Sequence, residues 1–171
     1  CFGGLTNNGA VPRDWILEYD SSIDALTTLP ATVPSPRYSF SCAENPLTHK
    51  IYCFGGYAPG GGYFDQIFEY DPSTGFITVK SAVLPTSRAE LSCVSTPQQN
   101  FIYCFGGRIS NTLLDQIVLY DTISDSISVQ PSVLPSPRRD HSCTRNSSTG
   151  LIYCFGGYDG NALNQIVEFN P

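Results

Sequence analysis

The sequence predicts an all-β chain made of serial copies of one four-stranded antiparallel unit. A Cys-Phe-Gly-Gly phrase occurs four times in the 171 residues, at residues 1–4, 53–56, 104–107 and 154–157. Its cysteines follow one another at steps of 52, 51 and 50 residues. A period near fifty residues is typical of stacked-repeat proteins, and at this length of a β-propeller blade.

Each repeat contains short β-branched and aromatic runs separated by Gly, Pro, Asn, Asp and Ser, and none keeps a helical period. Four short strands joined by short turns form an antiparallel meander, and such meanders pack face to face around a propeller axis. In the clearest repeat we expect strands over residues 91–95, 101–105, 116–120 and 127–129.

Two further features recur in each repeat. The Gly-Gly pair suits positive backbone φ and a close approach of neighbouring strands. A Pro-x-x-Arg segment at residues 34–37, 85–88 and 135–138 leads into the next unit, where proline is stiff and donates to no ladder. Length varies only after Gly-Gly, in segments 5–13, 57–64, 108–114 and 158–163.

These features resemble the kelch repeat family over the whole chain. The resemblance rests on the apolar run before Gly-Gly, the phrase Asp-x-Ile-x-x-Tyr-Asp at residues 65–71 and 115–121, the Pro-x-x-Arg segment, and Tyr-Asp-Gly-Asn at residues 158–161. It implies a kelch-type β-propeller, which most often provides a protein-interaction surface. We expect residues 1–171 to form one incomplete propeller region of about 3.5 repeats, which start near residues 1, 51, 102 and 152.

The chain departs from the family at one aromatic position. Kelch repeats usually carry a tryptophan some residues after the tyrosine of that phrase, where this chain has Leu26, Ile77 and Ile127. Its only tryptophan, Trp15, takes the place of a glutamine in the other repeats. The departure implies lighter packing between blades.

Composition limits the class of partner. Hydrophobic residues make up 41% of the chain and charged residues 14%, which indicates a globular protein. The net charge of -6 disfavours nucleic acid and anionic membrane surfaces. No apolar run is long enough to span a membrane. The chain begins and stops inside the repeat phrase, so we expect it to be a mature piece of something longer.

Six of the seven cysteines fall in pairs separated by ten residues. An even spacing lets a symmetric hairpin place both cysteines opposite each other, within disulfide reach. Disulfides are favoured, and they imply a secreted or cell-surface protein. The alternatives are buried free thiols and zinc, although zinc lacks a C-x-x-C motif and a nearby histidine. Cys1 would pair upstream of the chain. The predicted pairs are Cys42 with Cys53, Cys93 with Cys104, and Cys143 with Cys154.

Sugar attachment would agree with this location. Asn146-Ser147-Ser148 is an N-glycosylation sequon at the expected tip of the third cysteine hairpin. Threonines near prolines, at residues 27, 28 and 32, offer a compositional hint of O-linked sugar.

Catalytic and metal signals are weak. His49 and His141 occupy non-equivalent repeat positions, and we interpret both as exposed or structural. The acidic pairs at residues 20 and 24 and at residues 121 and 125 are interpreted as turn residues that hold backbone N–H groups. No catalytic residue, metal ligand or cofactor is predicted. The copper-radical oxidases of the kelch family need more ligands than two histidines supply.

Binding residues are expected where variable loops gather. In an up-and-down blade, the second-to-third connection and the connection to the next blade emerge on one face, and loops on rigid scaffolds carry function. The candidates are Tyr57, Tyr63, Arg108, Asn111, Tyr158 and Asp159, with Arg37, Arg88 and Arg138 nearby. Because the last three recur in every repeat, a structural hydrogen-bonding role is the alternative for them. Phe64, Leu114 and Leu163 are expected to plug each loop into the core.

Three functions follow. The favoured hypothesis is a non-catalytic, extracellular binding or scaffold module for a protein or glycan. The alternative is a structural subunit of a head-to-tail filament or surface assembly, in which open blade edges self-associate. An enzyme acting on carbohydrate is the least favoured.

Overall fold

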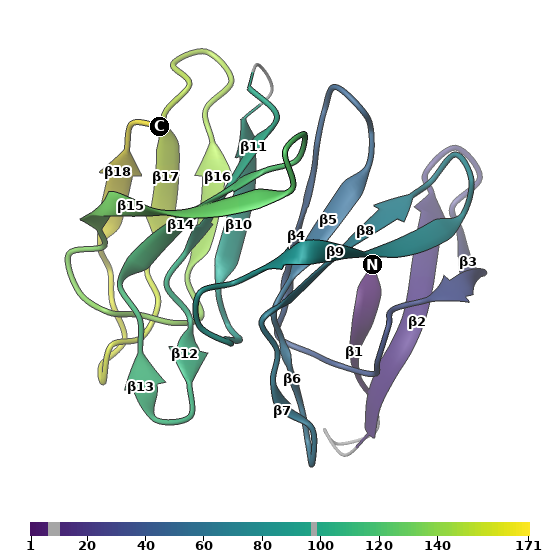
Figure 1. The fold of residues 1–171 in the computed structure, drawn as a ribbon, viewed down its shortest axis with the longest axis horizontal. Coiled ribbons are helices and arrows are strands. Elements are labelled where there is room, and N and C mark those ends of the chain that lie inside the picture. Colours follow the sequence, from purple (N-terminus) through teal and green to yellow (C-terminus); the bar gives the residue numbers. More distant parts are fainter. Residues whose placement is uncertain (7–10, 97–98) are drawn as a thin grey trace.

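Every regular element among the described residues is a β-strand. The computed structural model describes residues 1–6, 11–96 and 99–171, and the strands in those ranges form antiparallel sheets (Figure 1). Two parts of the sequence predictions lie outside the described residues. These are residues 7–10 in the first variable segment and residues 97–98 at the tip of the second cysteine hairpin.

Two sheets have the complete four-stranded meander that the repeat predicts. Each runs in sequence order from its first strand to its last, with a two-stranded hairpin set aside between the second and third. The second sheet of the chain contains β4 (Ser41–Glu44), β5 (Ile51–Phe54), β8 (Gln66–Asp71) and β9 (Phe76–Val83). The third contains β10 (Ser92–Thr96), β11 (Phe101–Phe105), β14 (Gln116–Asp121) and β15 (Ser126–Val133).

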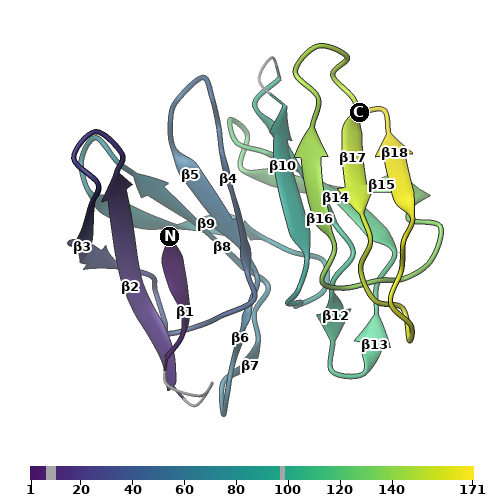
Figure 2. The same cartoon turned by 180° about the vertical axis from the view of Figure 1, so that it is seen from behind.

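The sheets at the two ends of the chain have three strands each. The first contains β1 (Phe2–Thr6), β2 (Val11–Asp20) and β3 (Ala25–Thr32), and the fourth contains β16 (Ser142–Arg145), β17 (Ile152–Phe155) and β18 (Ile166–Phe169). Strand β10 neighbours both β4 and β16, so the first strands of successive repeats line a common axis (Figure 2). The arrangement is a partial β-propeller.

Each variable segment of the two complete repeats contains a small hairpin that the sequence did not predict. The two-residue strands are too short to show a period. They are β6 (Tyr57–Ala58) with β7 (Gly62–Tyr63), and β12 (Arg108–Ile109) with β13 (Thr112–Leu113). Both hairpins project from the same end of the molecule (Figure 1).

The hydrophobic core lies between neighbouring sheets. Phe54 and Ile67 of the second sheet pack with Tyr120 of the third, and the rings of Phe54 and Tyr120 are 5.6 Å apart. Equivalent clusters join the first sheet to the second and the third to the fourth. At the positions where kelch repeats usually have tryptophan, Ile77 and Ile127 lie half-buried at the edge of these clusters, while Leu26 is 64% exposed.

The Gly-Gly pair joins each sheet to the next. Gly106 has a φ of 54°, and a Cβ at this position would lie 2.6 Å from the carbonyl oxygen of Arg138. The following residue, Gly107, donates its N–H to that same oxygen at 2.9 Å. Gly4 and Gly56 make the same bond to the next unit, which is the close approach that the sequence predicts.

Candidate functional site

The paired cysteines lie directly opposite each other in the ladders of the first two strands of the second, third and fourth sheets. Their registers place them face to face, and the structure joins each pair in a disulfide, as predicted. Cys1 is an exposed free thiol whose N-terminal amine donates to the Leu17 carbonyl. The disulfides are Cys42–Cys53, Cys93–Cys104 and Cys143–Cys154.

The recurring arginines are fully buried, so the binding-face interpretation of Arg37, Arg88 and Arg138 is wrong. Each guanidinium instead holds its own blade together. Arg37 donates to the carbonyl of Gly55 at 3.2 Å and to the side-chain oxygen of Gln66 at 2.6 Å. Burial lowers the pKa of Arg37 and of Arg88 to about 10, so both remain charged at neutral pH. The structural role that recurrence suggested is the one observed.

Backbone hydrogen bonds next to these arginines hold the start of each variable loop in place. In each unit the residue after the buried arginine forms an antiparallel bridge with the residue after Gly-Gly. In the third unit Ala89 and Arg108 exchange two N–H to carbonyl bonds of 3.0 and 2.9 Å. Because these bonds involve only main-chain atoms, the side chains at the bridge are free to differ. The other bridges join Tyr38 to Tyr57 and Arg139 to Tyr158.

The side chains at and beside these bridges form one surface, which we call the loop face. It is defined by Tyr38, Tyr57, Tyr63, Glu90, Arg108, Asn111, Arg139, Asp140, Tyr158 and Asp159. On the second unit, the ring of Tyr57 contacts those of Tyr38 and Tyr63, at 5.5 and 4.9 Å between centroids. Loop-face residues thus come from three successive units.

Charge is concentrated in the middle of the loop face. The Glu90 carboxylate accepts two hydrogen bonds from Arg108, at 2.7 and 2.8 Å, and one from Arg139 at 2.9 Å. The hydrogen bond to Glu90 raises the pKa of Arg108. The guanidinium of Arg139 also lies 4.9 Å from the ring centre of Tyr158. Burial and the charge of Glu90 raise the pKa of Asp140.

Two hollows open on the loop face. One, of about 240 Å³, lies on the axis and is lined by equivalent residues of three units, among them Ser39, Glu90 and Asp140. These three residues have positive φ, and their backbones are linked by hydrogen bonds from Glu90 to Ser39 and from Asp140 to Glu90. The other, of about 300 Å³, brings together Arg108, Asn111, Tyr158 and Asp159, four of the sequence-predicted candidates.

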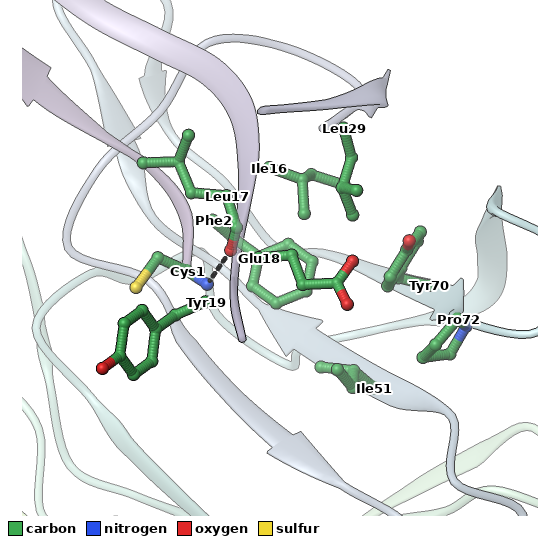
Figure 3. A pocket seen from close by; sticks show the side chains of 10 residues that line it. All are labelled: Cys1, Phe2, Ile16, Leu17, Glu18, Tyr19, Leu29, Ile51, Tyr70 and Pro72. Atoms are coloured by element: carbon green, nitrogen blue, oxygen red, sulfur yellow. Dashed lines mark hydrogen bonds between the residues drawn. The ribbon is translucent and has the colours of Figure 1, made fainter. Parts of the chain in front are cut away.

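A third hollow, of about 310 Å³, lies away from the loop face beside β1. Its lining is mainly apolar, and Figure 3 shows Phe2, Ile16 and Leu29 gathered near the side chain of Glu18. None of the predicted binding residues lines it.

The model of the KLHDC2/KLHL20/DRC7 Kelch-repeats domain matches residues 1–171. The chain belongs to the kelch-repeat family. A comparison with curated proteins found no match. Kelch repeats generally serve as protein-interaction modules, which agrees with variable side chains presented on one face of a repeated framework.

The remaining predicted positions of this kelch chain are mostly structural. Asp20 and Asp121 accept backbone N–H bonds in turns, as the sequence suggests. Phe64 is half-buried, with its ring 3.9 Å from the Arg37 guanidinium. Asn146 lies exposed at the tip of the third cysteine hairpin, where its side-chain oxygen accepts the N–H of Ser148 at 2.8 Å.

The two histidines differ in environment. His49 is exposed and bonds Glu44 at 2.9 Å. His141 is only 6% exposed, and neither ring nitrogen has a hydrogen-bond partner among the described residues. Burial, followed by the positive charge of Arg138, lowers the pKa of His141 to about 4, and the nearby Phe105 backbone offsets only part of this. Its imidazole is therefore neutral at neutral pH.

Sequence reasoning missed several loop-face residues, namely Tyr38, Glu90, Arg139 and Asp140. Their signal was positional, since they stand one or two positions after the recurring arginine and differ between repeats. In the part of the chain that the structure describes, no helix is long and apolar enough to cross a membrane.

Proposed function

We propose that this kelch chain is a non-catalytic, extracellular binding module whose loop face contacts a protein partner. One observation carries the proposal: residues that differ between repeats gather on one face, while the framework beneath them is the same in each repeat. Tyrosine and arginine are enriched among the residues that dominate protein interfaces. Both types meet here, in the contact of Arg139 with Tyr158.

The proposed extracellular location is supported by two features. Three disulfides clip the axis-side hairpins, and disulfides persist in oxidising compartments. Asn146 stands exposed in a sequon at a hairpin tip, where a glycosyltransferase could reach it. Mass mapping of non-reduced peptides from the secreted protein, with and without a deglycosylating enzyme, tests both features.

The binding face is tested with paired variants. The double variant N111A/Y158A removes two side chains that line the loop-face hollow, and L47A removes an exposed apolar side chain on a cysteine-hairpin tip, at the opposite end of the repeat. Secreted and cell-surface proteins captured by the immobilised wild type are then quantified on both variants. We expect at least about tenfold less of a specific partner on N111A/Y158A. A partner lost on L47A but retained on the loop-face variant would contradict the proposal.

A glycan partner is an outcome of the same design. If a glycan array labels the wild type and N111A/Y158A removes that signal, the loop face is a sugar-binding surface and the protein-partner proposal fails.

A structural subunit is the second candidate, and it is favoured by exposed apolar side chains on the end sheets. Trp15 and Tyr19 of the first sheet are 42% and 57% exposed, and Phe155 and Ile166 of the fourth are 45% and 65% exposed. Such faces drive association. Light scattering of the native protein decides: a discrete monomeric mass removes this candidate, and a concentration-dependent growing mass supports it.

A further inference from the structure

His141 stands two residues before Cys143 and lies against the Cys143–Cys154 disulfide. A ring nitrogen of His141 and the sulfurs of both cysteines all lie within 4.8 Å of one another. The sequence argument against zinc assumes that no histidine lies near a cysteine pair. For this hairpin that assumption is wrong.

The buried imidazole makes no hydrogen bond of ordinary geometry with a described residue, although the Phe105 backbone lies close enough to raise its pKa in part. By that geometric standard both of its nitrogens lack a partner among the described residues, although only 6% of the residue is exposed. Buried polar groups in native proteins are nearly always hydrogen-bonded, so each exception calls for a physical explanation. A metal ion bound to one nitrogen would satisfy it.

The other two cysteine hairpins provide an internal comparison. The residue two positions before the first cysteine is Phe40 in one and Leu91 in the other, and both pack in the hydrophobic core. Only the third hairpin has a ligand at that position. The three hairpins share register and disulfide, so this position is compared in the same local framework.

We propose that His141, Cys143 and Cys154 form a three-ligand site for a soft divalent cation such as Zn²⁺ when the Cys143–Cys154 disulfide is reduced. A thiol of the glutathione class supplies the reduction: two such thiols become one disulfide, and the protein sulfurs become two thiols. The cation then displaces one proton from each thiol and binds both sulfurs and the neutral imidazole. Three protein ligands leave a fourth position for water.

The geometry suits this set of ligands. With metal–sulfur and metal–nitrogen lengths of about 2.3 and 2.0–2.1 Å, tetrahedral ligand atoms stand about 3.5–3.8 Å apart. Once the sulfur–sulfur bond opens, atoms already within 4.8 Å need only small side-chain rotations to reach these separations. Two thiolates balance the charge of the cation. His141 also lines the axis hollow, through which water could reach the open position.

The disulfide and the metal site use the same sulfurs, so the two states exclude each other. Zinc must therefore shift the redox equilibrium of Cys143–Cys154 toward the reduced form by mass action. At a free zinc concentration about 100 times the dissociation constant, the ratio of reduced to oxidised hairpin rises about 100-fold.

The test uses the whole chain in a glutathione redox buffer, with and without Zn²⁺. Free thiols are trapped with an alkylating reagent, and the reduced fraction of each hairpin is read by peptide mass spectrometry. We expect zinc to raise the reduced fraction of Cys143–Cys154 and to leave Cys42–Cys53 and Cys93–Cys104 unchanged. His141→Phe, which copies the first hairpin, should abolish the response. Circular dichroism and intact disulfides in the oxidised variant establish that it folds.

A second measurement keeps the proposal open to refutation even if H141F does not fold. Co²⁺ added to the reduced wild type without oxygen should give a thiolate-to-metal charge-transfer band that Zn²⁺ removes. Absence of that band, an equal zinc response of all three hairpins, or an unchanged response in folded H141F would each overturn the proposal.

Discussion

Replacing Gly106 with alanine tests how successive units are held together. Gly106 has a φ of 54°, and an added Cβ would lie 2.6 Å from the Arg138 carbonyl oxygen and 3.1 Å from that of Leu114. Both contacts are with backbone, which cannot move aside like a flexible side chain. The left-handed conformation costs an L-residue about 1–2 kcal/mol, and overpacking of this kind adds about 1–3 kcal/mol. We therefore expect G106A to lower the free energy of unfolding by about 3 kcal/mol.

Gly75 provides the matched control. It has a φ of 75°, but a Cβ there would meet no atom within 4 Å. G75A should thus show only the conformational cost, about 1–2 kcal/mol. Urea unfolding followed by far-UV circular dichroism measures both variants against the wild type.

The difference between the two variants isolates the close approach. A gap of about 2 kcal/mol is expected from the close contacts of the added Cβ, which include the His141 ring at 2.9 Å as well as the two carbonyl oxygens. If G106A and G75A lose the same free energy within experimental error, contact between units does not explain the recurring glycine. In that case the positive φ alone would explain why glycine recurs at this position.

Three further predictions concern stability, each read from urea unfolding against the wild type. Replacing both Cys93 and Cys104 with alanine should cost about 3 kcal/mol through lost loop-closure entropy, and a cost near zero would contradict the constraint. R88M leaves carbonyl and amide acceptors buried without a donor, so we expect a loss of about 2–5 kcal/mol, and a neutral R88M would refute the structural role. Burial alone would raise the pKa of Glu69, but hydrogen bonds from Lys50 and a tyrosine and the charge of a second lysine lower it overall. The contribution of ionised Glu69 to the free energy of unfolding is therefore present above its ordinary pKa of 4.5 and lost as pH falls through the lower folded value. The stability gap between wild type and E69Q should close on acidification. A gap that stays constant with pH would contradict this.

Features set by local spacing could be predicted from the sequence. Ten residues between the paired cysteines place them opposite each other in a symmetric hairpin, and the structure pairs Cys93 with Cys104 in that register. The strand expected at residues 101–105 coincides with β11 (Phe101–Phe105). Side-chain alternation and turn chemistry act over a few residues, so the printed sequence contains their causes.

The role of the arginines depends on contacts that local patterns do not specify. Arg88 donates to Gln116, which lies 28 residues further along the chain. A signal did exist, because the glutamine recurs at nearly the same distance after each buried arginine. The joint recurrence of the arginine and the glutamine therefore indicates that the two residues are hydrogen-bond partners. The neighbourhood of His141, by contrast, had a local signal, because His141 stands two residues before Cys143 and alternate residues of an extended chain share a face.

The division between repeated and variable positions explains how one framework can present a changeable surface. The repeated residues, such as the fully buried Arg88 and its partner Gln116, bond through side chains, so their substitution costs stability. The bridge positions on the loop face bond through main-chain atoms, as Ala89 and Arg108 do. Side chains there can change without breaking a bond of the framework. Selection for a partner can therefore act on the bridge positions while the fold is maintained by the others, which is why differences between repeats, and not similarities, point to the surface that we propose for binding.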